Sequence, residues 1–188
     1  MKRLKIKGKQ IRDQSHYQVP VMKEKDLKSK GKTLEVISLS LEDLNDCLKL
    51  DAIALKGLWS KTQWENELSD SQRICLGIFD SSKLIALTCG WIIVDELHLT
   101  AVAVHPNYRR RGVAQTILGN LFIKAIRKGC NQATLEVKSN EPAALALYKR
   151  CGFQTTGRRS NYYTNGSDAL IQWKPLNLER ENKEQNPS

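Results

Sequence analysis

Long apolar runs are missing from this sequence of 188 residues. No stretch approaches the roughly 20 apolar residues of a membrane-spanning helix, and the basic N-terminus lacks the apolar core of a secretory signal. The sequence contains no GxGxxG pattern of dinucleotide-binding folds, and its GKT at 31–33 lacks the first glycine of the Walker pattern GxxxxGK(S/T), since position 26 is Asp. We therefore expect no membrane span, no secretory leader and neither of those two nucleotide sites.

Paired cysteines are missing as well. The chain has five cysteines, an odd number, and they are scattered without a CxxC pair. This arrangement predicts reduced thiols in a cytosol and argues against a disulfide framework or a zinc site, so we expect no metal. Cys89 and Cys151 lie among apolar neighbours and are expected to be small buried residues. The expected compartment is the cytoplasm, with a plastid as the alternative.

Acidic residues are scarce near the N-terminus. The formal net charge is +10, and residues 1–33 hold eleven Lys/Arg against three Asp/Glu, or +8, which leaves +2 for the rest. Few apolar residues and no periodicity predict that 1–33 is a disordered basic arm. Such an arm either contacts RNA or the ribosome through phosphates or is merely solvated. Its acidic residues and few serines argue against an organellar transit peptide. Residues 177–188 are predicted to form a polar tail.

Residues 34–176 carry the patterns of one α/β domain. Alternating or continuous apolar runs predict strands at 34–38, 73–79, 83–94, 96–104, 133–138, 153–161 and 168–174. Helical spacing predicts a helix from Gly112 to Lys128 and three more whose N-caps are Ser40, Ser60 and Asn140. Turns are expected at 80–82 and 95–96. This order predicts a mixed α+β sheet with helices on both faces and 99–104 as a central strand.

The most informative stretch leads from a buried strand through a basic turn directly into an amphipathic helix, between Val102 and Ala114. Free N–H groups at a helix start bind anions, and Gly112 lets the backbone approach a phosphate. Arg109, Arg110 and Arg111 add positive charge. The pattern favours a pyrophosphate site, although a glycine turn before a helix is also a common structural feature.

This stretch resembles the acetyl-CoA signature of the GNAT acetyltransferase family. Arg109-x-x-Gly112-x-Ala114 matches the family pattern Arg/Gln-x-x-Gly-x-Gly/Ala, in the same place between strand and helix. The resemblance implies the GNAT acyl-CoA N-acyltransferase fold, acetyl-CoA as co-substrate and backbone contacts to it. The residues implied in these contacts are Val102, Ala103, Val104, Arg109, Arg110, Arg111, Gly112, Val113, Ala114, Gln115 and Asn140.

A second block resembles the ribosomal-protein-alanine N-acetyltransferases of that family. Residues 135–153 are similar to their LEVR-x-SN-xxA-xxLY-xxxGF run, 158–163 to RRxNYY, and 168–171 to the run that follows. The likeness covers 34–176 and is dense from 99 to 174. It implies acetyl transfer to the N-terminal alanine of a ribosomal small-subunit protein, with Glu136 as general base and Tyr148 as general acid.

Simpler roles are open for each of these residues. A mid-strand glutamate such as Glu136 is commonly a solvated face residue, and Tyr148 also suits a packed helix stripe. Tyr162 and Tyr163 either line the acceptor groove or pack on a strand. His105 is expected at a turn or on the surface, without a catalytic role.

Two other functions are open. Acetylation of lysine side chains or of a small amine would use the same acetyl-CoA half. An α-amine has a pKa near 8 against ~10.4 for lysine, so a modest base suffices for it. A non-catalytic ribosome- or RNA-binding module with a CoA fold is the third function.

Overall fold

The computed structural model describes residues 28–29 and 32–177. Most of the predicted basic arm, and 178–188 of the predicted tail, lie outside these residues. Lys28–Ser29 (β1) and Lys32–Thr33 (β2) pair as a short antiparallel ladder, in a range where the sequence predicted no regular structure. In the described part of the chain, no helix combines the length and the apolar character needed to cross a bilayer.

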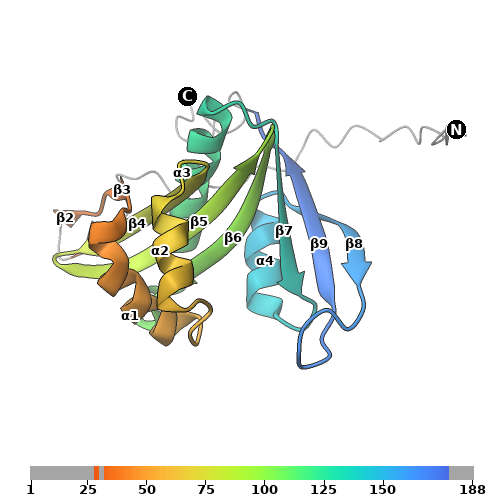
Figure 1. Ribbon diagram of the computed structural model, residues 1–188, viewed down its shortest axis with the longest axis horizontal. Coiled ribbons are helices and arrows are strands. Elements are labelled where there is room, and N and C mark those ends of the chain that lie inside the picture. Colours follow the sequence, from red (N-terminus) through yellow and green to blue (C-terminus); the bar gives the residue numbers. More distant parts are fainter. Residues whose placement is uncertain (1–27, 30–31, 178–188) are drawn as a thin grey trace, which may run out of the picture.

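A seven-stranded mixed sheet forms the centre of the domain (Figure 1), in the order β3-β4-β5-β6-β7-β9-β8. Only the β6–β7 pair is parallel. The strands are β3 Val36–Ser38, β4 Arg73–Asp80, β5 Lys83–Ile93, β6 Glu96–Val104, β7 Gln132–Lys138, β8 Gln154–Arg159 and β9 Ala169–Pro175. The predicted mixed sheet is confirmed, with β6 at its centre.

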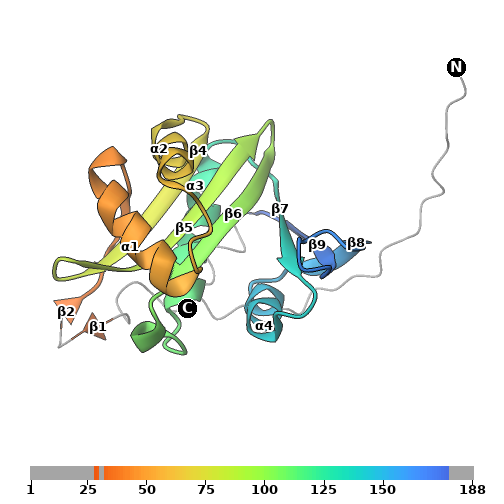
Figure 2. The same ribbon diagram turned by 60° about the horizontal axis from the view of Figure 1, so that its bottom comes forward.

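Helices cover both faces of this sheet (Figure 2), as predicted. They are α1 Leu44–Ala54, α2 Lys61–Ser69, α3 Val113–Arg127 and α4 Pro142–Arg150, with single 3₁₀ turns at Leu41–Asp43 and Pro106–Tyr108. One core joins α3 and α4 to the sheet, and the other joins α1 and α2 to its opposite face. Leu118 and Leu121 are fully buried in the first core, and Trp64 in the second.

Of the predicted caps, Ser60 starts α2, whereas Ser40 starts the 3₁₀ turn that leads into α1, whose own N-cap is Asp43. The Ser40 hydroxyl accepts from Glu42 N, and the Asp43 carboxylate accepts from Ser40 N, which starts the 3₁₀ turn before α1. Ser60 makes the same capping box with Gln63 at α2. The prediction for Asn140 is wrong: Glu141 occupies the N-cap of α4 without a side-chain cap.

Two further expectations are corrected by local backbone geometry. The β5–β6 turn lies at Val94-Asp95, one residue earlier than predicted, and Val94 takes the left-handed φ of 58° that the tight turn requires. His105 is at a turn, as predicted, but it is buried rather than on the surface, with 8% of its area exposed. Its burial follows from packing against the Tyr108 ring, whose centroid is 5.9 Å away.

The two parallel strands diverge soon after they meet. β6 and β7 pair only from Glu96↔Gln132 to His98↔Thr134, while β6 continues to Val104 and β7 to Lys138. Figure 1 shows them side by side at one end and separated at the other. The β6 residues beyond Leu99 therefore have a sheet partner on the β5 side, and the edge that faces β7 is left without one.

Candidate active site

The diverging edge of β6 presents backbone groups to the space between β6 and β7. His105 N donates to Ile85 O at 2.8 Å, which sets the hydrogen-bonded register of β6 with β5. By alternation, Ala103 directs its N–H and C=O to β5, whereas Val102 and Val104 direct theirs toward β7. Of the three predicted strand contacts, Val102 and Val104 are therefore the two whose backbone can meet a bound molecule there.

The start of α3 lies at the same end of β6. Gly112 is its N-cap with φ 78°, and Arg110 is also left-handed, with φ 63°. The first intrahelical bond reaches Gly112 O from Thr116 N, so the N–H groups of Val113 and Ala114 have no intrahelical acceptor. The first turn contains no acidic residue. Open N–H groups, the helix dipole and adjacent arginines make this end suited to a pyrophosphate.

The three arginines of the turn have different surroundings. Arg109 folds back on the protein, where its Nε donates to Val104 O at 3.1 Å and its Nη2 to Ala54 O at 3.5 Å. The Arg111 guanidinium lies 5.4 Å from the centroid of the Tyr108 ring. Arg110 and Arg111 are exposed. Arg109 thus braces the turn, and the other two are available to an anion.

Glu136 lies on the β7 face opposite to Leu135 and Val137, as the sequence predicted. Its carboxylate is 3.0 Å from Nη1 of Arg159 on β8, and its side chain is 19% exposed. A hydrogen bond from the Tyr162 hydroxyl to Glu136, together with the carboxylate's charge, raises the pKa of that phenol. Glu136 is therefore a partly buried carboxylate with two partners, and not a freely solvated face residue.

Tyr148 extends from α4, on the other side of β7. Its ring contacts Phe153 edge-on at 5.8 Å and belongs to the core of α3 and α4, so the packed-stripe role is real. Burial, followed by the charges of Cys151 and Tyr163, raises the pKa of its phenol above the usual 10. The hydroxyl therefore stays protonated near neutral pH and is able to donate a proton or a hydrogen bond.

The segment 160–168 brings two tyrosines to this site. Asp168 organises it: one carboxylate oxygen accepts from Asn161 N at 2.8 Å, and the other from Arg158 Nε at 2.6 Å. The bond from Asn161 N, then Arg158, lowers the pKa of Asp168. Tyr162 and Tyr163 pack edge-on at 5.2 Å, and the Glu136 charge contributes to raising the pKa of both.

Asn140 lies at the end of β7 and is exposed. Its Nδ2 donates to Ser167 Oγ at 3.4 Å, and the adjacent Ser139 N donates to Asp168 O at 2.9 Å. Both bonds tie the β7–α4 connection to the tyrosine segment. Asn140 therefore stays a candidate contact for the co-substrate while also holding this connection in place.

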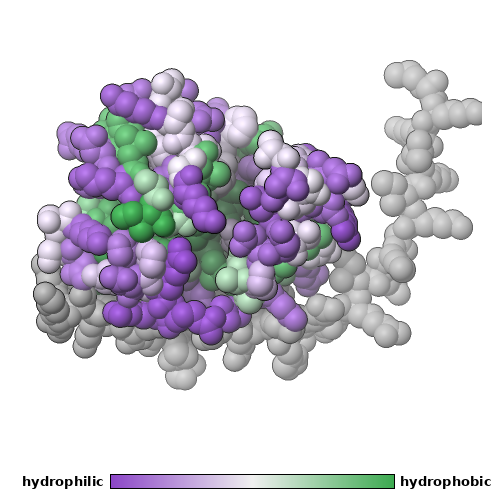
Figure 3. All heavy atoms as spheres, turned by 90° about the horizontal axis from the view of Figure 1, so that it is seen from below, coloured by the Kyte–Doolittle hydropathy of each residue, from purple (hydrophilic) through white to green (hydrophobic). Residues whose placement is uncertain are grey.

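The connection between α1 and α2 faces the site from the other helical layer and is held by a buried carboxylate. Asp51, 1% exposed, accepts from Leu58 N at 2.7 Å, Trp59 N at 3.1 Å and Trp64 Nε1 at 2.8 Å. In Figure 3, hydrophobic residues gather over the α1 side of this face, and hydrophilic ones cover most of the α4 side. Leu58, whose N–H is bonded to Asp51, has a side chain that is 47% exposed.

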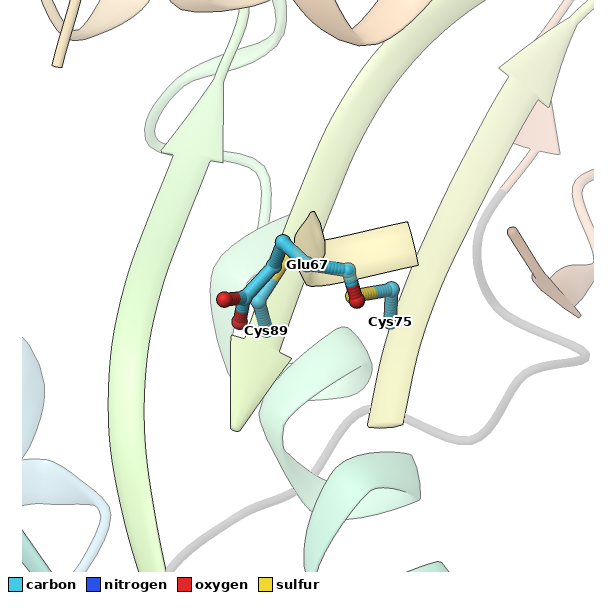
Figure 4. A group of neighbouring side chains, drawn as sticks. All are labelled: Glu67, Cys75 and Cys89. Carbon is cyan, nitrogen blue, oxygen red and sulfur yellow. The ribbon is translucent and has the colours of Figure 1, made fainter. Parts of the chain in front are cut away.

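A group with metal-ligand chemistry lies between α2 and the sheet. Glu67, Cys75 and Cys89 are buried, with their donor atoms within 4.8 Å of one another (Figure 4). The Glu67 carboxylate already pairs with the Arg73 guanidinium and accepts from Thr100 Oγ1 at 2.9 Å. Burial raises the pKa of the Cys89 thiol. Because an arginine supplies the positive charge and burial keeps the Cys89 thiol protonated, the group is a satisfied polar cluster of the core.

The structure thus brings Glu136 together with Tyr162 and Tyr163 around the end of β7, with Tyr148 within electrostatic reach. It places the predicted phosphate turn at the neighbouring strand end. Arg159 and Asp168 lie in the stretches that resemble the acetyltransferase family, but the sequence alone assigns no role to either residue. Strand alternation is the sequence feature that could have indicated a role for Arg159. Successive arginines on β8 must face opposite sides of the sheet, and Arg159 shares the face of Glu136.

Comparison with known proteins agrees with this geometry. Residues 39–153 match the model of the acetyltransferase (GNAT) family. A putative [ribosomal protein bS18]-alanine N-acetyltransferase of Bacillus subtilis is 31% identical over 144 residues, which are 76% of this chain and 95% of the relative.

Solved structures share the fold. The ribosomal-protein-S18-alanine N-acetyltransferase from Escherichia coli superposes with a TM-score of 0.71 at 28% identity, covering 77% of this chain and 95% of that one. Arabidopsis thaliana NAA60, solved with acetyl-CoA, superposes with a TM-score of 0.69 at 17% identity, covering 77% and 99%. The chain belongs to the GNAT family of acetyltransferases.

Proposed function

We infer that this enzyme transfers acetyl from acetyl-CoA to the N-terminal α-amine of a protein, with an alanine-starting ribosomal small-subunit protein as the expected acceptor. The observation that carries the inference is the pairing of two features at one end of the sheet. An anion-binding helix start adjoins the open edge of β6, and a carboxylate on β7, Glu136, lies across from that edge. The two named bacterial relatives support the acceptor.

Acetyl-CoA fits the residues present at the β6–α3 junction. The N–H groups of Val113 and Ala114 would hold its pyrophosphate, with Arg110 and Arg111 adding charge. The backbone of Val102 and Val104 would hold the extended arm between the strands, as an added strand is held by a sheet edge. Acetyl-CoA supplies an acetyl group activated as a thioester.

The chain's own residues then divide the chemistry between the two sides of β7. Glu136 removes a proton from the amine, directly or through water, as the amine attacks the acetyl carbon. The Val104 N–H, directed toward β7, stabilises the oxyanion of the tetrahedral intermediate. Tyr148, kept protonated by burial, donates its proton to the departing thiolate. No cysteine needs to carry the acetyl group in this scheme.

The test is release of free CoA from acetyl-CoA in the presence of matched peptides. One peptide begins with a free alanine; a second has the same sequence with its N-terminus blocked and an internal lysine; serine- and methionine-starting peptides complete the set. We expect turnover to require the free terminus and to be fastest with alanine. Turnover on the blocked lysine peptide alone would replace the proposed acceptor with a lysine side chain.

The basic residues 1–33, with a charge of +8, support a second and separable part of the proposal: contact with ribosomal RNA. Deleting them is expected to remove RNA binding that weakens as salt rises, while acetylation of the short alanine peptide persists. Equal RNA binding by the full chain and the deleted chain would refute this contact.

The bacterial relatives support a cytoplasmic location.

A further inference from the structure

Two neighbouring arginines on the edge strand β8 have different partners. Arg158 pairs with Asp168, whereas Arg159 pairs with Glu136, two strands away across β9. Ala169 of β9 pairs with both Lys138 and Arg159, and its small side chain leaves room for Arg159 to reach across. The Arg159 guanidinium also lies 5.4 Å from the centroid of the Tyr162 ring, whose hydroxyl bonds to Glu136.

We propose that Arg159 is a specificity-determining residue, a charge gate that admits a neutral amine to Glu136 and disfavours a charged ammonium. The proposal rests on the proposed function, because it concerns the amine that Glu136 deprotonates. An ammonium approaching this carboxylate meets a guanidinium that already occupies it at 3.0 Å. Like charges that share one anion repel each other, so the second cation binds less well.

The other groups that face Glu136 strengthen this discrimination. Lys138, on the same face of β7, places its ammonium 5.0 Å from the centroid of the Tyr163 ring. Tyr162 and Tyr163 are neutral phenols near neutral pH, because the ordinary pKa of a phenol is about 10. The pKa is raised further for Tyr162, first by its bond to Glu136, and for Tyr163, first by burial and then by the Glu136 charge. The described surroundings of Glu136 are thus two cations and two neutral rings, with Arg159 the cation in direct contact.

The charge gate favours α-amines for a simple reason. An α-amine with a pKa near 8 is partly neutral at pH 7.5, whereas a lysine with a pKa of ~10.4 is almost wholly charged. A gate that excludes ammonium therefore lowers the acetylation rate of the α-amine only slightly and lowers that of the lysine strongly. Since the Arg159 side chain is 53% exposed, solvent weakens the repulsion, and we expect a discrimination of about fivefold from this residue.

The test compares Arg159→Gln with Arg158→Gln in the full chain. Each removes one charge from β8, but only the first removes the partner of Glu136. The kcat/KM values for the alanine peptide and for the blocked lysine peptide are measured from pH 7 to pH 10. Arg159→Gln is expected to raise the lysine rate relative to the alanine rate about fivefold at pH 7.5. The gain should vanish near pH 10, where lysine approaches neutrality.

Arg159→Lys keeps the charge and is expected to restore the wild-type ratio, which a packing defect would not do. Arg158→Gln is expected to lower both rates together through the Asp168 segment, without changing their ratio. An unchanged ratio in Arg159→Gln, or a change independent of pH, would overturn the gate alone. Absence of turnover on either peptide by the wild-type enzyme, with acetyl-CoA bound, would overturn the proposed function and the gate with it.

Discussion

The two halves of the site use different chemical groups. At β6 and α3 the binding groups are backbone N–H groups, exposed because a strand lacks a neighbour and a helix lacks a side-chain cap. At β7, α4 and 160–168 the acting groups are side chains, each held by another side chain. The backbone groups of Val102, Val104 and the α3 start at Gly112 form a cradle for the co-substrate. Such a cradle tolerates many side chains, whereas a network of ion pairs depends on single residues. We therefore expect substitutions to act very differently in the two halves.

The largest effect is expected from Glu136→Gln, which keeps the shape of the side chain and removes its basicity. We predict that kcat on the alanine peptide falls by roughly a hundredfold or more, while the Kd of acetyl-CoA is unchanged. Stopped assays for CoA release and calorimetric titration of acetyl-CoA measure the two quantities. Glu65→Gln on the surface of α2, where Glu65 pairs with Lys61 at 3.8 Å, is the control and should behave as wild type. A residual kcat near the wild-type value would move the base to another group.

Tyr148→Phe is expected to rank second. The ring and its contact with Phe153 are kept and only the proton donor is lost, so kcat should fall by about tenfold to a hundredfold without a change in Tm. Because burial raises the pKa of this phenol, the wild-type rate should show no loss from its ionisation up to pH 10. A drop in Tm with full residual activity per folded molecule would leave Tyr148 with a packing role alone.

The backbone half is probed by Gly112→Ala. A left-handed φ of 78° costs an L-residue about 1–2 kcal/mol, and shifting the turn misaligns the N–H groups. We predict that the Kd of acetyl-CoA rises about fivefold and that kcat at saturation is nearly unchanged. Gly129→Ala is the matched control: its φ is +95°, it ends the same helix, and a Cβ there meets nothing within 4 Å. It should lose comparable stability and keep its affinity for acetyl-CoA.

The contrast between the halves also explains what could be predicted from the sequence. The order of elements, the central strand and the capping roles of Ser40 and Ser60 follow from local patterns, because caps and periodicity depend on neighbouring residues. The cradle at Gly112 could be predicted for the same reason, since strand, basic turn and helix adjoin in the chain. The exact turn at Val94 and the cap of α4 depend on backbone details, and the sequence predicts each of them one residue away from its position in the structure.

The side-chain half of the site can be predicted only in part from the sequence. Glu136 could be assigned its face from alternation, but its partner Arg159 lies 23 positions later and reaches it across β9. That contact depends on the strand order β7-β9-β8, which no local pattern specifies. The role of Asp168 as the organiser of 160–168 likewise depends on a left-handed Asn161, with φ 52°. Long-range register, rather than chemistry, is what the sequence left open.

The smallest effect is expected at His105, beside the cradle. Burial, then the charges of Lys83 and Arg109, lower its pKa below 6.5, so below that pH the unfolded chain binds more protons than the folded one. The stability that depends on neutral His105 is complete above about pH 6.5 and is lost as the pH falls. His105→Asn, whose amide oxygen can still accept from Asn107 N, should lose about 2 °C less in Tm between pH 7.5 and 5 than the wild type. His98→Asn, which alters a histidine bonded to Thr134 at 3.2 Å, is measured beside it as the control for replacing a histidine. Equal losses in all three proteins would show that the charges around the cradle do not act on His105, and that this half is insensitive to side-chain ionisation as well as to side-chain identity.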